Sequence, residues 1–291
     1  MPWVNIVPNP PASSNKPSNR ITAGLLSGVS TAALFHPFDK AIYRSQMKRR
    51  ALLHSKNFIN SYQGFSQTIV QKTLQGGSYY FFQSSFKPVK KQLEEKTKLS
   101  KASINGIFGL MIGTTNTFIN HPLTVIRYKT WNRPQFNFVT ASKALWAQHR
   151  ARSFYQGLPA GLLRDNSFAI VYEVVRHQLK DENKSPVSQF ASNAFAGGCA
   201  MSISSPFNYA RNYIFYHTDK NHQPSMRAAA KFFIQENVTN TRGYSQVLKN
   251  ILTDLKLGPA TLRIALGMAS GQFLFDYCYQ TLEKSSSKVS P

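Results

Sequence analysis

A threefold recurrence of one proline motif constrains the fold of this chain more than any other feature. Pro37, Pro122 and Pro206 lie 85 and 84 residues apart. Each is near the end of a stretch without acidic or basic residues, and these stretches are 21–38, 102–126 and 185–210. About 20 helical residues cross the ~30 Å hydrocarbon core of a bilayer. The repeat therefore predicts three copies of one unit, each containing a helix of near-spanning or spanning length.

The residues around the prolines extend the repeat. The three copies read His-Pro-Phe-Asp39-Lys-Ala-Ile42, His-Pro-Leu-Thr124-Val-Ile-Arg127 and Ser-Pro-Phe-Asn208-Tyr-Ala-Arg211. A second element, Tyr-Gln-Gly, ends at Gly64 and again at Gly157, and each copy opens an expected helix. Shorter apolar stretches at 73–86, 166–172 and 264–275 alternate with the charge-free ones. This alternation predicts six helices in three pairs.

The pattern resembles the mitochondrial carrier family, whose repeats carry Pro-x-Asp/Glu-x-x-Lys/Arg at the end of each odd-numbered helix. The resemblance covers the chain from about Arg20 to Lys284. It implies an all-α membrane protein with six transmembrane helices in three pseudo-symmetric two-helix repeats around a central cavity. The repeats are expected at 20–99, 100–183 and 184–284, between a disordered N-terminal tail, 1–19, and a polar C-terminal tail, 285–291.

The resemblance also implies a gate at each end of the cavity. A proline removes a backbone donor and kinks a helix, so Pro37, Pro122 and Pro206 are expected to turn the odd-numbered helices toward the axis. Ion pairs between neighbouring repeats then close one end, and a second motif on the even-numbered helices closes the other. Alternating closure of the two ends moves a solute without opening a pore.

At the odd-helix ends, the motif is incomplete. The acidic position holds Asp39, Thr124 and Asn208, and the basic position holds Ile42, Arg127 and Arg211. The family's geometry then allows one ion pair, Asp39–Arg127. Thr124 and Arg211 can form a hydrogen bond at best. Asn208 and Ile42 can form neither an ion pair nor a hydrogen bond.

At the even-helix ends, the matching positions read Ser84/Lys87, His177/Lys180 and Asp276/Tyr279. Only Lys180–Asp276 is an ionic combination. Two interpretations follow. The chain is either a carrier with low closing barriers that tends toward net transport, or a degenerate member that no longer transports. The first interpretation is favoured.

The short connections from Pro37 to Gly64 and from Pro122 to Gly157 predict a trimmed surface helix in the first two repeats.

Solute contacts are implied on the even-numbered helices, about two turns after the helix-opening glycine. In the first two repeats the expected contact position lies seven residues after Gly64 and Gly157. In the third repeat it lies thirteen residues before Asp276. The expected contact residues are Gln71, Lys72, Arg164, Asp165, Phe168 and Arg263. Cations in a low-dielectric cavity are costly without an anion, so these residues predict a ligand with phosphates or carboxylates. For Arg164, local pairing with Asp165 is the alternative, and Lys72 can instead snorkel to an interface.

The favoured solute is a nucleotide such as ATP or ADP, exchanged across the mitochondrial inner membrane, with amino acids or carboxylates as the alternative. The Arg164-Asp165 pair resembles members that carry amino acids, whereas the number of basic contacts favours a polyphosphate. No cofactor or metal is expected, and the expected partners are the bilayer, an anionic lipid such as cardiolipin, and no nucleic acid. The chain is expected to be a monomer. Its loss of motif residues suggests a further hypothesis, a carrier-like effector that an intracellular bacterium delivers to host mitochondria.

The net charge of +23 leaves one rival class, a basic helical protein that binds nucleic acid. Clusters such as Lys48-Arg49-Arg50 suit that class, but they equally suit loops beside membrane helices. Two cysteines, Cys199 and Cys278, exclude a disulfide scaffold and a cysteine-rich zinc site. No nucleophile elbow, phosphate loop or paired-carboxylate site is present in the sequence, so an enzyme is not expected.

Overall fold

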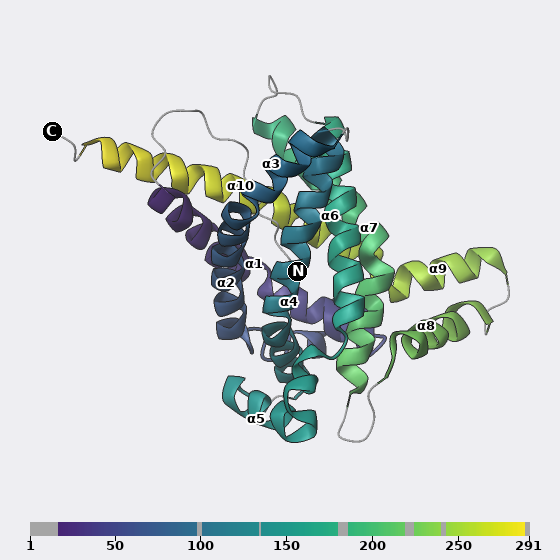
Figure 1. Cartoon of the computed structure of the whole chain (residues 1–291). Coiled ribbons are helices and arrows are strands. Elements are labelled where there is room, and N and C mark those ends of the chain that lie inside the picture. Colours follow the sequence, from purple (N-terminus) through teal and green to yellow (C-terminus); the bar gives the residue numbers. More distant parts are fainter. Residues whose placement is uncertain are drawn as a thin grey trace.

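The computed structural model describes residues 17–97, 101–133, 135–179, 186–218, 224–239 and 243–288. All regular secondary structure in these ranges is helical (Figure 1), which confirms the all-α prediction. Six helices have 21 to 32 residues each. They are α1 (Pro17–Met47), α2 (Phe65–Ser85), α4 (Lys101–Asn132), α6 (Leu158–Leu179), α7 (Pro186–His217) and α10 (Leu257–Lys288).

The six long helices pack as a closed ring in chain order. Helix α1 contacts α2, α2 contacts α4, α4 contacts α6, α6 contacts α7, and α7 contacts α10. Helix α10 then packs back against α1, so the first and last long helices are neighbours. This seam is the ring contact between the first and the last of the six long helices, whereas the other five ring contacts join long helices that are consecutive in the chain.

Shorter helices lie outside the ring. They are α3 (Lys87–Lys96), α5 (Phe138–His149), α8 (Met226–Ile234) and α9 (Tyr244–Asp254), and α8 and α9 lie together at the right of Figure 1. Asn137 opens α5 with a capping box, which satisfies backbone donors of its first turn. The connection in the first repeat contains only a 3-10 turn, Ser55–Asn57. The predicted trimming is therefore correct for the first repeat and wrong for the second, where α5 has 12 residues.

Each motif proline lies inside a long helix. Pro37, Pro122 and Pro206 are followed by ten or eleven further helical residues in α1, α4 and α7. The charge-free stretches therefore end within helices that continue as basic and polar segments. Similarly, α1 begins at Pro17 and α10 ends at Lys288, so the expected tail boundaries at residues 19 and 285 fall inside helices. Residues 1–16 and 289–291 lie outside the described residues.

The histidine before each of the first two prolines holds the start of the next long helix. His36 Nε2 donates to the carbonyl oxygen of Gln63 at 3.1 Å, and His121 Nε2 donates to that of Gln156 at 2.8 Å. Each of these glutamines precedes a glycine with positive φ, +81° at Gly64 and +70° at Gly157. A left-handed residue there lets the chain turn directly into α2 or α6.

Lys256 takes the place of that glycine in the third repeat. It has a φ of +52° and immediately precedes α10, as Gly64 precedes α2 and Gly157 precedes α6. A non-glycine residue in this conformation is strained. Arg263 lies seven residues after Lys256, the offset that links Gly64 to Gln71 and Gly157 to Arg164. The same local turn thus recurs before all three even-numbered long helices.

The polarity of the bundle is reversed relative to that of a water-soluble protein. Basic side chains such as Lys40, Arg164 and Arg211 are buried, whereas Phe195, Leu262 and many other large apolar side chains of the long helices are exposed. Water-soluble domains almost never bury Lys or Arg without a paired partner. By hydropathy, none of the helices in the described part of the chain is both long and apolar enough to cross a membrane.

Candidate functional site

A cavity of about 30 Å³ lies where α1, α2, α4, α7 and α10 meet. Among the described residues that line it, four are basic, Lys72, Arg127, Arg211 and Arg263, and one is acidic, Asp39. One water needs about 10–15 Å³ of such space, so the cavity accommodates about two water-sized particles. This site is small and strongly cationic.

Asp39 and Arg263 form the ion pair of this cavity. Arg263 Nε lies 2.5 Å from Asp39 Oδ1, and Arg263 Nη2 donates to Asp39 Oδ2 at 2.6 Å. The expected partner was Arg127, and that prediction is wrong in this structure. Helix α10 packs directly against α1, so Arg263 reaches Asp39 across the seam. The Arg127 guanidinium lies instead over the rings of Tyr128 and Trp131, at 5.4 and 5.0 Å from their centroids.

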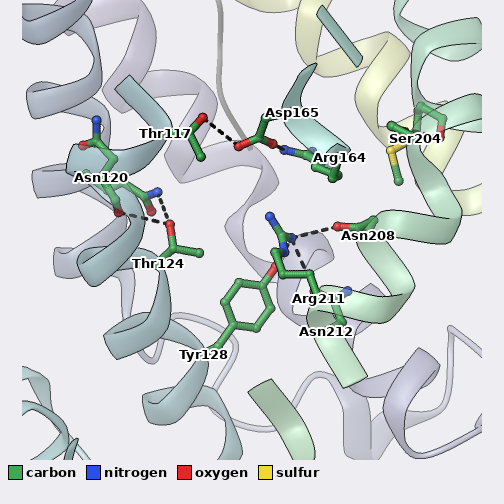
Figure 2. A network of polar contacts seen from close by, with 12 residues as sticks. Thr117, Asn120, Thr124, Tyr128, Arg164, Asp165, Ser204, Asn208, Arg211 and Asn212 are labelled. Carbon is green, nitrogen blue, oxygen red and sulfur yellow. Dashed lines mark hydrogen bonds and ion pairs between the residues drawn. The ribbon is translucent and has the colours of Figure 1, made fainter. Parts of the chain in front are cut away.

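Arg211 is held by neutral groups (Figure 2). Its Nη2 donates to Asn208 Oδ1 at 2.7 Å and to the Tyr128 hydroxyl at 3.0 Å. The expected Thr124–Arg211 hydrogen bond is therefore not the one formed. The Thr124 hydroxyl instead accepts a 2.8 Å hydrogen bond from Gln71 Nε2, because α2 is the nearer neighbour of α4 at this level. Ile42 packs in an apolar cluster, consistent with the absence of a predicted polar contact to Asn208.

Arg164 pairs with its sequence neighbour Asp165, which was the alternative to a solute contact. It is 1% exposed, and its Nη1 lies 2.5 Å from Oδ1 of the adjacent Asp165. The Asp165 Oδ2 accepts a 3.0 Å hydrogen bond from Thr117 (Figure 2). Phe168 stacks on Tyr172 inside an apolar cluster. Of the six expected contact residues, Lys72 and Arg263 line the cavity; Gln71, Arg164, Asp165 and Phe168 are not among its lining residues.

The expected gate at the even-helix ends lies largely beyond the described part of the structure. Lys180 is outside the described residues, and the side chains of Lys87 and His177 are not described. Tyr279 is buried and stacks on Phe275 with ring centroids 6.1 Å apart. Asp276 is partly buried one position before the exposed Tyr277. The pairing Lys180–Asp276 stays a prediction.

Sequence reasoning missed an aromatic layer beside the cavity. Tyr43 and Tyr128 each follow the basic position of the motif, and their rings meet edge to face at 4.6 Å. Trp131 packs on both rings, and the Tyr43 hydroxyl donates to Asn132 Oδ1 at 2.7 Å. The recurrence of tyrosine one residue after the basic position was a usable signal. All three rings line the cavity beside Arg127 and Arg211.

Outside the ring, Arg49 forms a second ionic contact between the first and third repeats. It lies 2.7 Å from Glu236 and 3.3 Å from Asp254. Partial burial alone would lower the pKa of Arg49, but the two carboxylates outweigh it and raise that pKa. Lys256 nearby donates to the backbone oxygen of Arg50 at 3.2 Å. These contacts bridge the seam where the ring joins α1 to α10.

Known proteins similar to this chain are mitochondrial carriers. The chain is 27% identical to the mitochondrial carrier protein LEU5 of Saccharomyces cerevisiae over 155 residues, which cover 46% of this chain and 43% of LEU5. It is 23% identical to the mitochondrial glycine transporter of Homo sapiens over 216 residues, 66% of this chain and 70% of that protein. It is 22% identical to the mitochondrial substrate carrier family protein A of Dictyostelium discoideum over 293 residues, 92% of this chain and 86% of that protein.

The LEU5 match thus spans less than half of that relative. No family model matches the chain. The structure of the chain is a ring of six long helices with a basic cavity among five of them. The similarity to these relatives, at 22 to 27% identity, supports the interpretation of the chain as a divergent mitochondrial carrier.

Proposed function

We propose that this protein transports a small anionic metabolite across the mitochondrial inner membrane by alternating access. The observation that carries the proposal is the cavity at the meeting point of five long helices, whose described lining has four basic side chains and one acidic one. Such a surplus of buried positive charge is costly unless an anion joins it. Binding an anion would therefore repay part of the cost of opening the cavity.

The reversed polarity of the bundle supports the membrane part of the proposal. Large apolar side chains with about 60% exposure, such as Phe195, Leu262 and Phe273, are spread over the long helices. In lipid, that exposure is favourable, while polar side chains are expected to face the interior of a bundle. We therefore propose that α1, α2, α4, α6, α7 and α10 are the six spans of three two-helix repeats.

A nucleotide such as ATP or ADP is the proposed solute, because its phosphates match several converging cations. Lys72 and Arg263 are the proposed contacts within the cavity, and Arg164 is a further contact after it releases Asp165. Amino acids or carboxylates are the second candidate. The name of the human relative refers to glycine, and a paired Arg164–Asp165 could receive both ends of a zwitterion.

The described end of the cavity would be closed by the Asp39–Arg263 ion pair and the layer of Tyr43, Tyr128 and Trp131. One ionic contact leaves a lower barrier than three would, which favours net transport beside exchange. The same proposal includes a monomer in the bilayer, with an anionic lipid such as cardiolipin against its basic loops. For a bacterial source, the expected place is the host mitochondrion, and a tagged chain that stays in the cytosol of transfected cells would contradict that hypothesis.

Uptake into liposomes tests the transport proposal. Purified protein would be reconstituted, and uptake of labelled ATP, glutamate and glycine would be measured with and without internal solute. We expect ATP uptake that Arg263→Ala abolishes, and uptake into empty liposomes if the closing barrier is low. The matched control is Arg152→Gln, which removes an exposed arginine of the α5–α6 connection and should leave uptake unchanged.

Other outcomes discriminate between the candidates. Glutamate or glycine uptake without ATP uptake would replace the nucleotide with the second candidate. No uptake of any solute by folded protein would favour the degenerate interpretation. Release of the protein from membranes by high salt alone would favour the nucleic-acid-binding class, since that binding is salt-dependent.

A further inference from the structure

The cavity contains two buried arginines that no carboxylate balances. Arg127 and Arg211 are 6% and 3% exposed, and both line the cavity. The Nε–H groups of both are buried and have no hydrogen-bond partner among the described residues. Within the same part of the chain, neither arginine forms an ion pair, because the two nearby carboxylates, Asp39 and Asp165, are held by Arg263 and Arg164.

The internal repeat explains where the missing negative charge would have been. The first repeat has Asp39 two residues after its proline, and the other two copies have Thr124 and Asn208 at that position. Both basic residues of those copies, Arg127 and Arg211, are nevertheless present. The two guanidiniums lie over the ring of Tyr128, each 5.4 Å from its centroid. Two like charges therefore share one buried aromatic surface, and the hydrogen-bond partners of Arg211 there are neutral.

We propose that a single halide-sized anion, chloride under physiological conditions, binds in this cavity against Arg127 and Arg211 and completes the closed gate. A buried charge without a counter-charge is strongly destabilising, so an anion that neutralises the pair stabilises the closed ring. The volume of about 30 Å³ suits a monatomic ion and is too small for a metabolite. The two arginines share this cavity with Lys72 and Arg263, the proposed solute contacts.

Anion binding at this site does not require that the protein transports anything. As a consequence for the proposed function, chloride would favour the closed state and slow uptake into empty liposomes. A solute anion that reaches the arginines would have to displace the chloride. The two proposals can thus fail separately, because chloride binding is measured on the purified protein and transport is measured in liposomes.

Thermal unfolding of the detergent-solubilised full chain tests the site. The Tm would be followed while sodium chloride replaces sodium gluconate at constant ionic strength, with bromide as a second halide. We expect a saturable rise in Tm with chloride and bromide. The rise should be lost in Arg127→Gln and in Arg211→Gln, and it should persist in the matched surface variant Arg152→Gln.

Asn208→Asp keeps the test decisive if the arginine variants fail to fold. Asn208 Oδ1 already accepts from Arg211 at 2.7 Å, so this nearly isosteric change places a carboxylate where the anion's charge is needed. We expect Asn208→Asp to raise the Tm in gluconate toward the wild-type value in chloride and to flatten the chloride titration. A flat titration in the wild type, or an equal chloride response in wild type and Asn208→Asp, would overturn the proposal.

Discussion

The ion pair across the α1–α10 seam offers the sharpest test of how the ring is held. A double-mutant cycle around this ion pair consists of Asp39→Asn, Arg263→Gln and the double variant. The pair has two N···O distances, 2.5 Å from Arg263 Nε to Asp39 Oδ1 and 2.6 Å from Arg263 Nη2 to Asp39 Oδ2. The two side chains are only 18% and 6% exposed. Removal of one partner from a buried pair costs about 3–5 kcal/mol, because the other charge stays buried, whereas removal of both is often nearly neutral.

Each single variant should therefore lower the free energy of unfolding by about 3 kcal/mol or more. The double variant should cost no more than one single variant, which gives a coupling energy of about 3 kcal/mol. Thermal unfolding of the detergent-solubilised protein, followed by tryptophan fluorescence, measures all four forms. Lys91→Gln is the control, because Lys91 and its partner Glu95 are 78% and 61% exposed, and exposed pairs contribute about 1 kcal/mol or less. Additive single variants, each costing under about 1 kcal/mol, would refute a buried pair at the seam.

Two further predictions concern the turns that open the even-numbered helices. Gly157→Ala should lower the free energy of unfolding by about 1–3 kcal/mol, since φ at this position is +70° and the new Cβ would lie 3.2 Å from Phe215. Gly113→Ala is the control and should cost nothing, because Gly113 is helical and no described atom beyond its local helix lies within 4 Å of the new Cβ. Equal Tm shifts in the two variants would contradict this prediction. Lys256→Gly should be more stable than Lys256→Ala by about 1 kcal/mol. Both variants lack the lysine amine, but alanine is strained at the positive φ of this position and glycine is not. Burial lowers the pKa of Lys256 against the opposing effect of Asp254, so the unfolded chain binds more protons between that lowered pKa and 10.5. Stability should accordingly rise with pH across this alkaline window, and a pH series of Tm values for Lys256→Gly should lack that contribution.

Much of the architecture was predictable because local signals recur. Three prolines at nearly equal spacing, two copies of Tyr-Gln-Gly, and short apolar stretches that alternate with the charge-free ones together predicted six helices in order. The third turn was harder to place, since Lys256 occupies the left-handed position that glycine takes elsewhere. The register that leads to Arg263 came instead from Asp276, and the offset from Lys256 leads to the same residue.

The partners of the charged residues were less predictable. Asp39 had two candidate arginines, and the choice of Arg263 over Arg127 depends on which helices touch at one level of the ring. Arg127 found an alternative in the rings of Tyr128 and Trp131. Arg164 had a carboxylate next to it in sequence, and that local contact is the one formed. Such competitions are decided by a few ångströms of helix placement, which residue spacing does not encode.

The seam between α1 and α10 also bears on how the protein is made. Arg263 lies 224 residues after Asp39, so the carboxylate is synthesised long before its partner exists. Until α10 is synthesised, the contacts that it makes with α1 and α7 cannot form. The ring can therefore close only after the last of its helices has been translated, whatever the order in which the other helix contacts form.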